Sequence, residues 1–382
     1  MTDAPTVKRV TWAELFFDLV FVVAVTRVSG LLSSHHGWTD VLRALIVFVP
    51  VYWTWVGVAV QANLRDMDRP TSKLLLFAVA LAGVFMALSL QDAYGSRGLA
   101  FAAAYWVGRI VLGAGAFRHG WRVGLLNPVG ISVVLTGPLL IVGALVPGWW
   151  RVAIWAAAAL IDLSTPRLLR RRLVDMQLDA DHFAERFGLF VLIALGETVA
   201  SVGTSIPASR LGVAGAFGVA AAFVMICGLW WVYFNFAADA MRHSMATAKI
   251  QADISRLVLS YGHLAFIASI IVVAVGLHTS IEAPTHPLGW GIAALLYGGA
   301  ATYLATFGFT RWTMFRLVSW TRLSAAAVVL VLLPLAAVAD ALAAVTVLAV
   351  VLIVLNVIEY MRVGRIGWRA LLAGRAATSA AP

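Results

Sequence analysis

Twelve apolar segments, each about 20 residues long, follow one another along almost the whole chain. A helix needs about 20 mostly apolar residues to cross the hydrocarbon core of a bilayer, and a backbone in that core must satisfy its own hydrogen bonds. The segments cover residues 11–33, 40–62, 73–92, 99–118, 129–146, 149–165, 183–204, 211–237, 254–278, 288–309, 319–338 and 340–361. We therefore predict an all-α polytopic transmembrane helix bundle of about twelve helices.

The composition is typical of a membrane protein that has almost no part outside the membrane. Of the 382 residues, 62% are hydrophobic and only 12% are charged, about half the usual charged share of a soluble domain. The net charge of +10 does not indicate a nucleic-acid partner, because the basic residues lie singly or in short clusters between apolar runs. The partners that we expect are membrane lipids and a small solute or ion, with a homo-oligomer as a further alternative.

The positions of the basic residues predict the orientation. If the N-terminus lies inside, the inner connections and tails hold 21 of the 28 Lys and Arg residues, the outer ones hold 4, and 3 lie within helices. Cytoplasmic loops of membrane proteins carry such an excess of Lys and Arg. We expect a multi-pass protein of the inner (plasma) membrane with both termini in the cytoplasm.

The longest inner connection, residues 166–182, reads TPRLLRRRLVDMQLDAD and divides the chain into two sets of six segments. Residues 12–29 align without gaps with residues 183–200 and share Glu14 with Glu185. Six helices per half return the chain to the same side, which predicts two parallel halves related by an axis along the membrane normal. The predicted divisions are a first half (1–165), a basic cytoplasmic linker (166–182), a second half (183–361) and a cytoplasmic tail (362–382).

Ionisable residues inside the predicted spans are the candidates for function. A charge in the hydrocarbon core costs about 2.5–3.5 kcal/mol on insertion scales, so we expect each charged residue there to have a structural or functional role. Glu14 and Asp18 lie four residues apart, on one face of the first span. One turn at the start of the seventh span presents an imidazole, a carboxylate and a guanidinium, and another acid follows three turns deeper. The candidate site residues are Glu14, Asp18, His182, Glu185, Arg186, Glu197 and Arg109.

Three interpretations of these residues stay open. In the first, they form structural ion pairs, such as Glu14 or Asp18 with Arg186, and Glu197 with Arg109 or Arg27. In the second, they form a path for protons, ions or a solute. In the third, they bind a divalent metal, since His-x-x-Glu on a helix is a known ligand spacing. The candidate ligands for that metal are Asp18, His182, Glu185, Asp239 and His243; no cofactor is otherwise indicated.

Two blocks of sequence resemble a known family. The first, W-x-E-L-F-F-D-L-V-F-V from Trp12 to Val22, and the second, H-F-x-E-R-F-G-L-F-x-x-I-x-L-G-E from His182 to Glu197, are similar to those of the bacterial low-temperature-requirement A family. The resemblance implies a multi-pass bacterial inner-membrane protein linked by its family name to growth in the cold, and it implies no reaction. The polar positions that match are Glu14, Asp18, His182, Glu185, Arg186 and Glu197.

From these observations we expect a proton- or cation-coupled transporter or permease. Glu14, Asp18 and Glu185 would accept a proton or cation, Arg186 would bias their protonation, and Glu197 with Arg109 would form a deeper gate or binding pair. One alternative is a membrane-embedded enzyme that acts on a lipid or isoprenoid substrate through the same cluster as an acid–base or metal site. Another is a structural or stress-response membrane protein without turnover.

Overall fold

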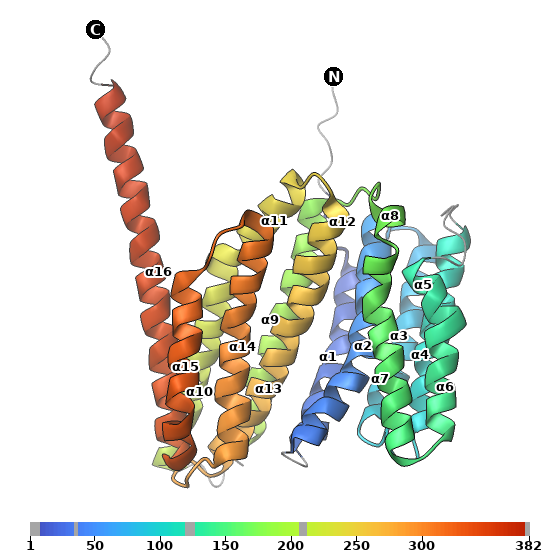
Figure 1. The fold of residues 1–382 in the computed structure, drawn as a ribbon, viewed down its shortest axis with the longest axis horizontal. Coiled ribbons are helices and arrows are strands. Elements are labelled where there is room, and N and C mark those ends of the chain that lie inside the picture. The colour runs from blue at the N-terminus through green and yellow to red at the C-terminus, as the bar shows by residue number, and fades with distance from the viewer. Residues whose placement is uncertain (1–7, 34–36, 119–126, 206–211, 379–382) are drawn as a thin grey trace.

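The protein is an all-helical bundle. The structure is a computed structural model that describes residues 8–33, 37–118, 127–205 and 212–378, and these form helices without a β-strand. The longer helices stand side by side (Figure 1). They are α1 (Trp12–Ser33), α2 (Trp38–Leu64), α3 (Pro70–Leu90), α4 (Gly98–Arg118), α6 (Gly137–Leu145), α7 (Gly148–Leu168), α9 (Ala180–Ser205), α10 (Val213–Val232), α11 (Ala238–Thr247), α13 (His263–Glu282), α14 (Trp290–Phe315), α15 (Trp320–Val338) and α16 (Ala341–Thr378).

The predicted spans agree with the observed helices. Within the described residues, eleven helical runs are long and apolar enough to cross a membrane. The remaining predicted span, 149–165, forms α7, which is less apolar because it contains Arg151 and Asp162. The span predicted at 211–237 is longer than expected, since a helical run continues from Val213 to Thr247.

The segments predicted as the linker and the tail are partly helical. Helix α7 continues to Leu168, and the short helix α8 (Arg170–Leu173) follows within the linker. Helix α16 extends to Thr378, so the predicted tail begins as a continuation of the last helix. α1 begins at the end of the bundle from which α16 leaves it (Figure 1), as an even number of crossings requires.

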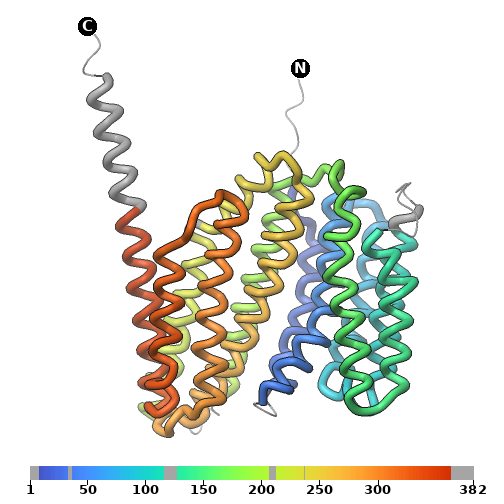
Figure 2. The backbone as a smooth tube through the Cα atoms, viewed as in Figure 1, coloured from blue at the N-terminus to red at the C-terminus, as the bar shows by residue number. Residues whose placement is uncertain are grey.

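Helices α1 to α7 lie on one side of the bundle and α9 to α16 on the other, as the blue-to-green and yellow-to-red parts of the trace show (Figure 2). The packing order recurs: α1 packs on α3, α3 on α4 and α2 on α7, while α9 packs on α13, α13 on α14 and α10 on α16. The two sides of the bundle therefore share one packing order, and the two halves with their boundaries stay a prediction. The sides meet where α1 contacts α9 and α13, and where α2 contacts α9.

Within the described residues, three π-helical segments interrupt the α-helical runs. They are η1 (Ser132–Thr136), between the short helix α5 (Pro128–Ile131) and α6; η3 (Tyr233–Ala237); and η4 (Ser255–Gly262), which follows the short helix α12 (Gln251–Ile254). Such bulges are rare and are frequent at functional sites. Each carries buried polar contacts here, for example the hydroxyl of Tyr52, which donates to the Ser260 carbonyl of η4 at 2.7 Å. The π segments therefore mark where polar groups enter an otherwise apolar bundle.

Candidate functional site

A capping box fixes Glu14 at the first turn of α1. The Glu14 carboxylate accepts hydrogen bonds from the backbone N–H of Thr11 (2.8 Å) and from its hydroxyl (2.9 Å). Thr-x-x-Glu is the sequence signature of this motif, in which the two residues satisfy each other's free groups at a helix start. Oε2 of Glu14 is held in this way, and Oε1 is left to face the neighbouring helices.

The start of α9 is fixed by Asp179 and Asn63. The Asp179 carboxylate accepts a hydrogen bond from the His182 N–H at 2.9 Å. Asn63, near the end of α2, accepts from the Asp179 N–H at 2.9 Å and donates from Nδ2 to the Asp179 carbonyl at 2.8 Å. This reciprocal pair sets the orientation of the Asn63 amide, so that its Nδ2 also lies 3.2 Å from His182 Nδ1.

Four ionisable side chains then meet between α1 and α9. Arg186 Nη1 donates to Glu14 Oε1 at 2.9 Å, and Arg186 Nη2 donates to Asp18 Oδ1 at 2.7 Å. His182 Nε2 lies 3.0 Å from the same Glu14 oxygen. All four side chains are fully buried. We call Glu14, Asp18, His182 and Arg186 the buried cluster.

Aromatic side chains enclose the buried cluster. Trp55 of α2 donates from Nε1 to Asp18 Oδ1 at 2.8 Å, and its ring stacks on Phe190 of α9 with centroids 4.3 Å apart. The Arg186 guanidinium lies 5.6 Å from the centroid of the Trp55 ring, within the range of a cation–π contact. Two buried atoms of the cluster have no hydrogen-bond partner among the described residues, Asp18 Oδ2 and Arg186 Nε. One carboxylate oxygen of Asp18 is therefore free within a closed site.

The bonding pattern assigns the protons on His182. Asn63 Nδ2 is a donor, so His182 Nδ1 accepts from it and carries no hydrogen. The proton of the imidazole then lies on Nε2, which donates it to Glu14. In this arrangement the imidazole is neutral, and the buried cluster contains two carboxylates against one guanidinium.

The structure separates the other candidate residues from this cluster. Glu185 is exposed on another face of α9, where it lines a surface pocket with Asp239. Glu185 aligns with Glu14 in the internal alignment, but Glu14 is buried and Glu185 is exposed. Glu197 is half-buried and lies near Thr26 of α1. The expected pair of Glu197 with Arg109 or Arg27 is not formed, because Arg109 bonds to other groups and Arg27 donates to Gln91 Oε1 at 3.2 Å.

The set of metal ligands expected from the sequence does not converge. Asp18 and His182 are buried between helices, whereas Glu185, Asp239 and His243 are exposed. In the part of the chain that the structure describes, no group of three or more His, Cys, Asp or Glu side chains is placed to hold a metal ion. Sequence spacing did not show that these residues face different neighbours.

A second buried polar group lies within the first half. Arg109 of α4 donates from Nη2 to Ser132 Oγ at 2.6 Å and from Nη1 to the Trp53 carbonyl at 3.2 Å. Ser132 in turn donates to Asp162 of α7 at 2.8 Å, and Tyr105 and Thr136 also bond to that carboxylate. Sequence reasoning missed Asp162, although an acid within a predicted span was a signal that could have identified it.

The residues of the buried cluster lie within a part of the chain that matches a known protein family. The sequence profile of the family described as "Bacterial low temperature requirement A protein (LtrA)" matches residues 9–357. The chain belongs to this family. It is also 31% identical over 313 residues to an uncharacterized protein of Rhizobium meliloti (strain 1021), RA0937, an alignment that covers 78% of this chain and 76% of the relative. No solved structure is similar to it.

The buried cluster of this LtrA-family protein is made by the two blocks that carry the resemblance. Glu14 and Asp18 come from the first block, and His182 and Arg186 come from the second. Trp55 and Asn63 complete the site from α2 and lie outside both blocks, so the sequence alone did not connect them to it.

Lys8, which precedes α1, bonds to the end of α2 beside the buried cluster. Its ammonium donates to the carbonyls of Ala62, Asn63 and Arg65 at 2.5–2.6 Å, and so caps the end of α2 beside the residue that holds His182. Burial lowers the pKa of Lys8, while the nearby charge of Glu14 acts in the opposite direction. Cations are favourable at a helix C-terminus because they neutralise its free carbonyl groups.

Replacing Lys8 by methionine is expected to lower the free energy of unfolding by about 1–2 kcal/mol, because three carbonyls lose a charged donor. The measurement is an SDS titration of the purified protein in mixed micelles. Lys73→Met is the matched control, since Lys73 is partly exposed and only pairs with Asp68 at 3.7 Å. Equal stability of the two variants would show that Lys8 does not cap α2.

Proposed function

We propose that this LtrA-family protein is a transporter of a small solute coupled to protons, and that Asp18 carries the coupled proton. The observation that supports this is a fully buried ionic cluster, with one unpartnered carboxylate oxygen, at the contact between the two sides of the bundle. Ionisable groups within membrane helices commonly mark proton and ion pathways. The cytoplasmic termini and the inner-membrane location that the sequence predicts are part of this proposal.

The net charge of the cluster indicates that it binds one proton. With a neutral His182, the two carboxylates and the Arg186 guanidinium sum to one negative charge. An unbalanced charge in a medium of low dielectric constant is costly, and one bound proton removes it. Asp18 Oδ2 is the only carboxylate oxygen among the described residues of the cluster with no donor near it, so it is the atom that can take the proton without losing a bond.

Because the cluster lies between the two sides of the bundle, binding of this proton is coupled to the relative movement of α1 and α9. Helix α1 supplies the carboxylates and helix α9 supplies Arg186 and His182, so each ionic bond crosses between the two sides. The unbalanced negative charge of the deprotonated cluster is less costly in water than in a closed site, so a proton on Asp18 favours the buried arrangement. Loss of the proton therefore favours hydration of Asp18 and separation of α1 from α9, and rocking of two halves is a known way to alternate access.

The test is a flux assay in proteoliposomes that contain a fluorescent pH indicator, with a broad panel of amino acids, sugars, organic acids and amines added outside. We expect at least one solute to cause proton movement with the parent protein. Asp18→Asn removes the titrating oxygen but leaves an acceptor for Trp55 and Arg186, so it should fold and lose the coupled proton movement by tenfold or more.

Asp40→Asn is the matched control for this assay. Asp40 lies in the first turn of α2 and is 3.9 Å from Arg43, away from the cluster. It should keep the parent's flux. Proton movement that is absent from the parent for every solute, or that is unchanged in a folded Asp18→Asn protein, would refute the proposal.

A further inference from the structure

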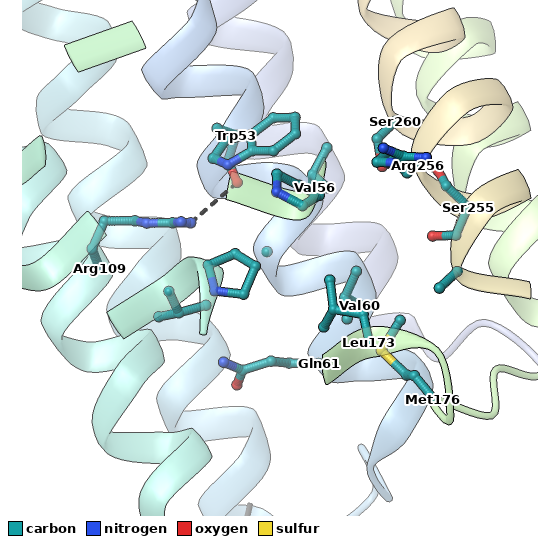
Figure 3. A pocket seen from close by; sticks show the side chains of 15 residues that line it. Trp53, Val56, Val60, Gln61, Arg109, Leu173, Met176, Ser255, Arg256 and Ser260 are labelled. Atoms are coloured by element: carbon teal, nitrogen blue, oxygen red, sulfur yellow. Dashed lines mark hydrogen bonds between the residues drawn. The ribbon is translucent and has the colours of Figure 1, made fainter. Parts of the chain in front are cut away.

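A cavity lies between the two sides of the bundle, separate from the buried cluster. Its volume is about 80 Å³, room for a small polar group and a few carbon atoms, and it is partly open to the surface. Helices α2, α4 and α5 line one side, and α8, α12 and η4 line the other (Figure 3). The wall is largely apolar, with Trp53, Val56, Val60, Leu173 and Met176 among its residues.

The charged residues that line this cavity are arginines. Arg109 and Arg256 are both in its wall, and no Asp or Glu lines it within the described part of the chain. Among the described residues, Arg109 is 1% exposed and forms two hydrogen bonds, both to uncharged acceptors, while its Nε has no partner. A guanidinium has five N–H donors, so Arg109 retains unused donor capacity at a buried position.

A glycine in α2 allows the Arg109 side chain to pack closely against that helix. A Cβ added at Gly57 would lie 2.8 Å from Arg109 Nη1 and 2.7 Å from Leu112 Cδ2, closer than side chains pack. Figure 3 shows the Arg109 side chain extending toward α2, where it bonds to the Trp53 carbonyl. Glycine at position 57 therefore allows the guanidinium to lie at the wall of the cavity.

The second arginine adds positive charge at the other side. Arg256 Nη2 donates to Asp253 at 3.0 Å, but Asp253 is shared with Arg170, which contacts it at 2.8 and 2.5 Å. One carboxylate thus faces two guanidinium groups, which leaves one net positive charge beside the cavity. Ser255 and Ser260 of η4 line the same side and supply hydroxyl groups.

We infer that this cavity binds an amphiphilic anion, meaning a carboxylate or phosphate on an apolar chain. The arginines match the anionic group, because a guanidinium forms strong, charge-assisted hydrogen bonds with carboxylate and phosphate oxygens. The apolar wall matches the first carbons of the chain, and the rest of the chain extends out of the open side. The inference goes beyond the proposed function, since such a ligand can be bound whether or not it is transported.

The experiment measures binding of tritiated laurate to the full-length protein in phosphatidylcholine nanodiscs by scintillation proximity. We expect saturable binding that decyl phosphate displaces and that dodecyltrimethylammonium, a cation with an equal chain, does not. Val60→Trp fills the cavity and Arg256→Gln removes the charge of the less buried arginine, so each should weaken binding at least tenfold. Val107→Trp, on the exposed face of the helix that carries Arg109, is the control and should bind as the parent does.

A second arm identifies the source of the anion. Phosphatidylglycerol in the nanodisc should reduce laurate binding if the headgroup of a membrane lipid occupies the cavity, and should leave it unchanged if the ligand is a free anion; both results support an amphiphilic anion. Absence of saturable binding, equal displacement by the cation, or equal effects of Val60→Trp and Val107→Trp would overturn the inference. Arg256→Gln is near the surface and keeps the test valid if Val60→Trp does not fold.

Discussion

Replacing Arg186 by methionine is expected to lower the stability of the protein so far that little folded material accumulates. Arg186 is the only cation bonded to Glu14 and Asp18 among the described residues, and both carboxylates are fully buried. Removing one partner of a buried ionic group costs about 3–5 kcal/mol, because the remaining charges keep their desolvation penalty without compensation. Two carboxylates would then also repel each other.

The measurement is fluorescence-detection size-exclusion chromatography of tagged protein, followed by thermal unfolding of any folded fraction. Arg27→Met is the matched control, because Arg27 is half-buried and bonds only to the amide oxygen of Gln91. It should yield protein near the parent's level. A monodisperse Arg186→Met protein with the parent's melting temperature would show that the cluster is not a structural requirement.

A compensated variant separates lost charge from lost volume. Glu14→Gln, Asp18→Asn and Arg186→Met together remove all formal charge from the cluster, and buried ionic groups can often be replaced by neutral ones at little cost. We expect this triple variant to fold better than Arg186→Met alone. If it is equally unstable, packing around Trp55 rather than charge determines the stability at this site.

Asp162→Ala is expected to have an effect of similar size, about 3–5 kcal/mol on the free energy of unfolding. The Asp162 carboxylate accepts from Ser132 at 2.8 Å and from Thr136 at 3.0 Å, and Tyr105 also donates to it. Without it, three buried hydroxyls lose an acceptor and Arg109 loses the only nearby negative charge in the described first half. Helix α4 and segment η1 lose their common bonding partner on α7.

The loss is measured by SDS titration in mixed micelles or, if the protein is too unstable, by the yield of monodisperse protein. Asp340→Ala is the control, since Asp340 is exposed at the turn between α15 and α16 and should leave stability near the parent's. Asp162→Asn keeps an acceptor and should fall between the two. Equal behaviour of Asp162→Ala and Asp340→Ala would contradict a structural role for the carboxylate.

The helices near the C-terminal end of the bundle contain a direct ion pair, which the sequence did not predict. Arg322 of α15 forms two hydrogen bonds with Glu359 of α16, at 2.8 and 2.9 Å, and Thr321 donates to the same carboxylate at 3.0 Å. Arg322 also lies 4.5 Å from the centroid of the Phe307 ring. Arg322 and Glu359 therefore join the neighbouring helices α15 and α16.

The sequence by itself determined the helices and the start of the site. Runs of about 20 apolar residues specify spans wherever they occur, because a backbone in lipid has few alternatives to a helix. The capping box of Thr11 and Glu14 and the four-residue spacing of Glu14 and Asp18 likewise depend only on local geometry. These local rules correctly placed the carboxylates at one end and on one face of α1.

Only the tertiary structure decided which charges meet. Spacing along a helix gives the depth and the face of a side chain, but the neighbour of that face depends on how the helices pack. Arg186 therefore contacts Glu14 and Asp18, while Glu185, the adjacent residue, is exposed on another face of α9. Arg109 lies near Asp162 instead of Glu197 because α4 packs within the first half, whereas α9 lies in the second.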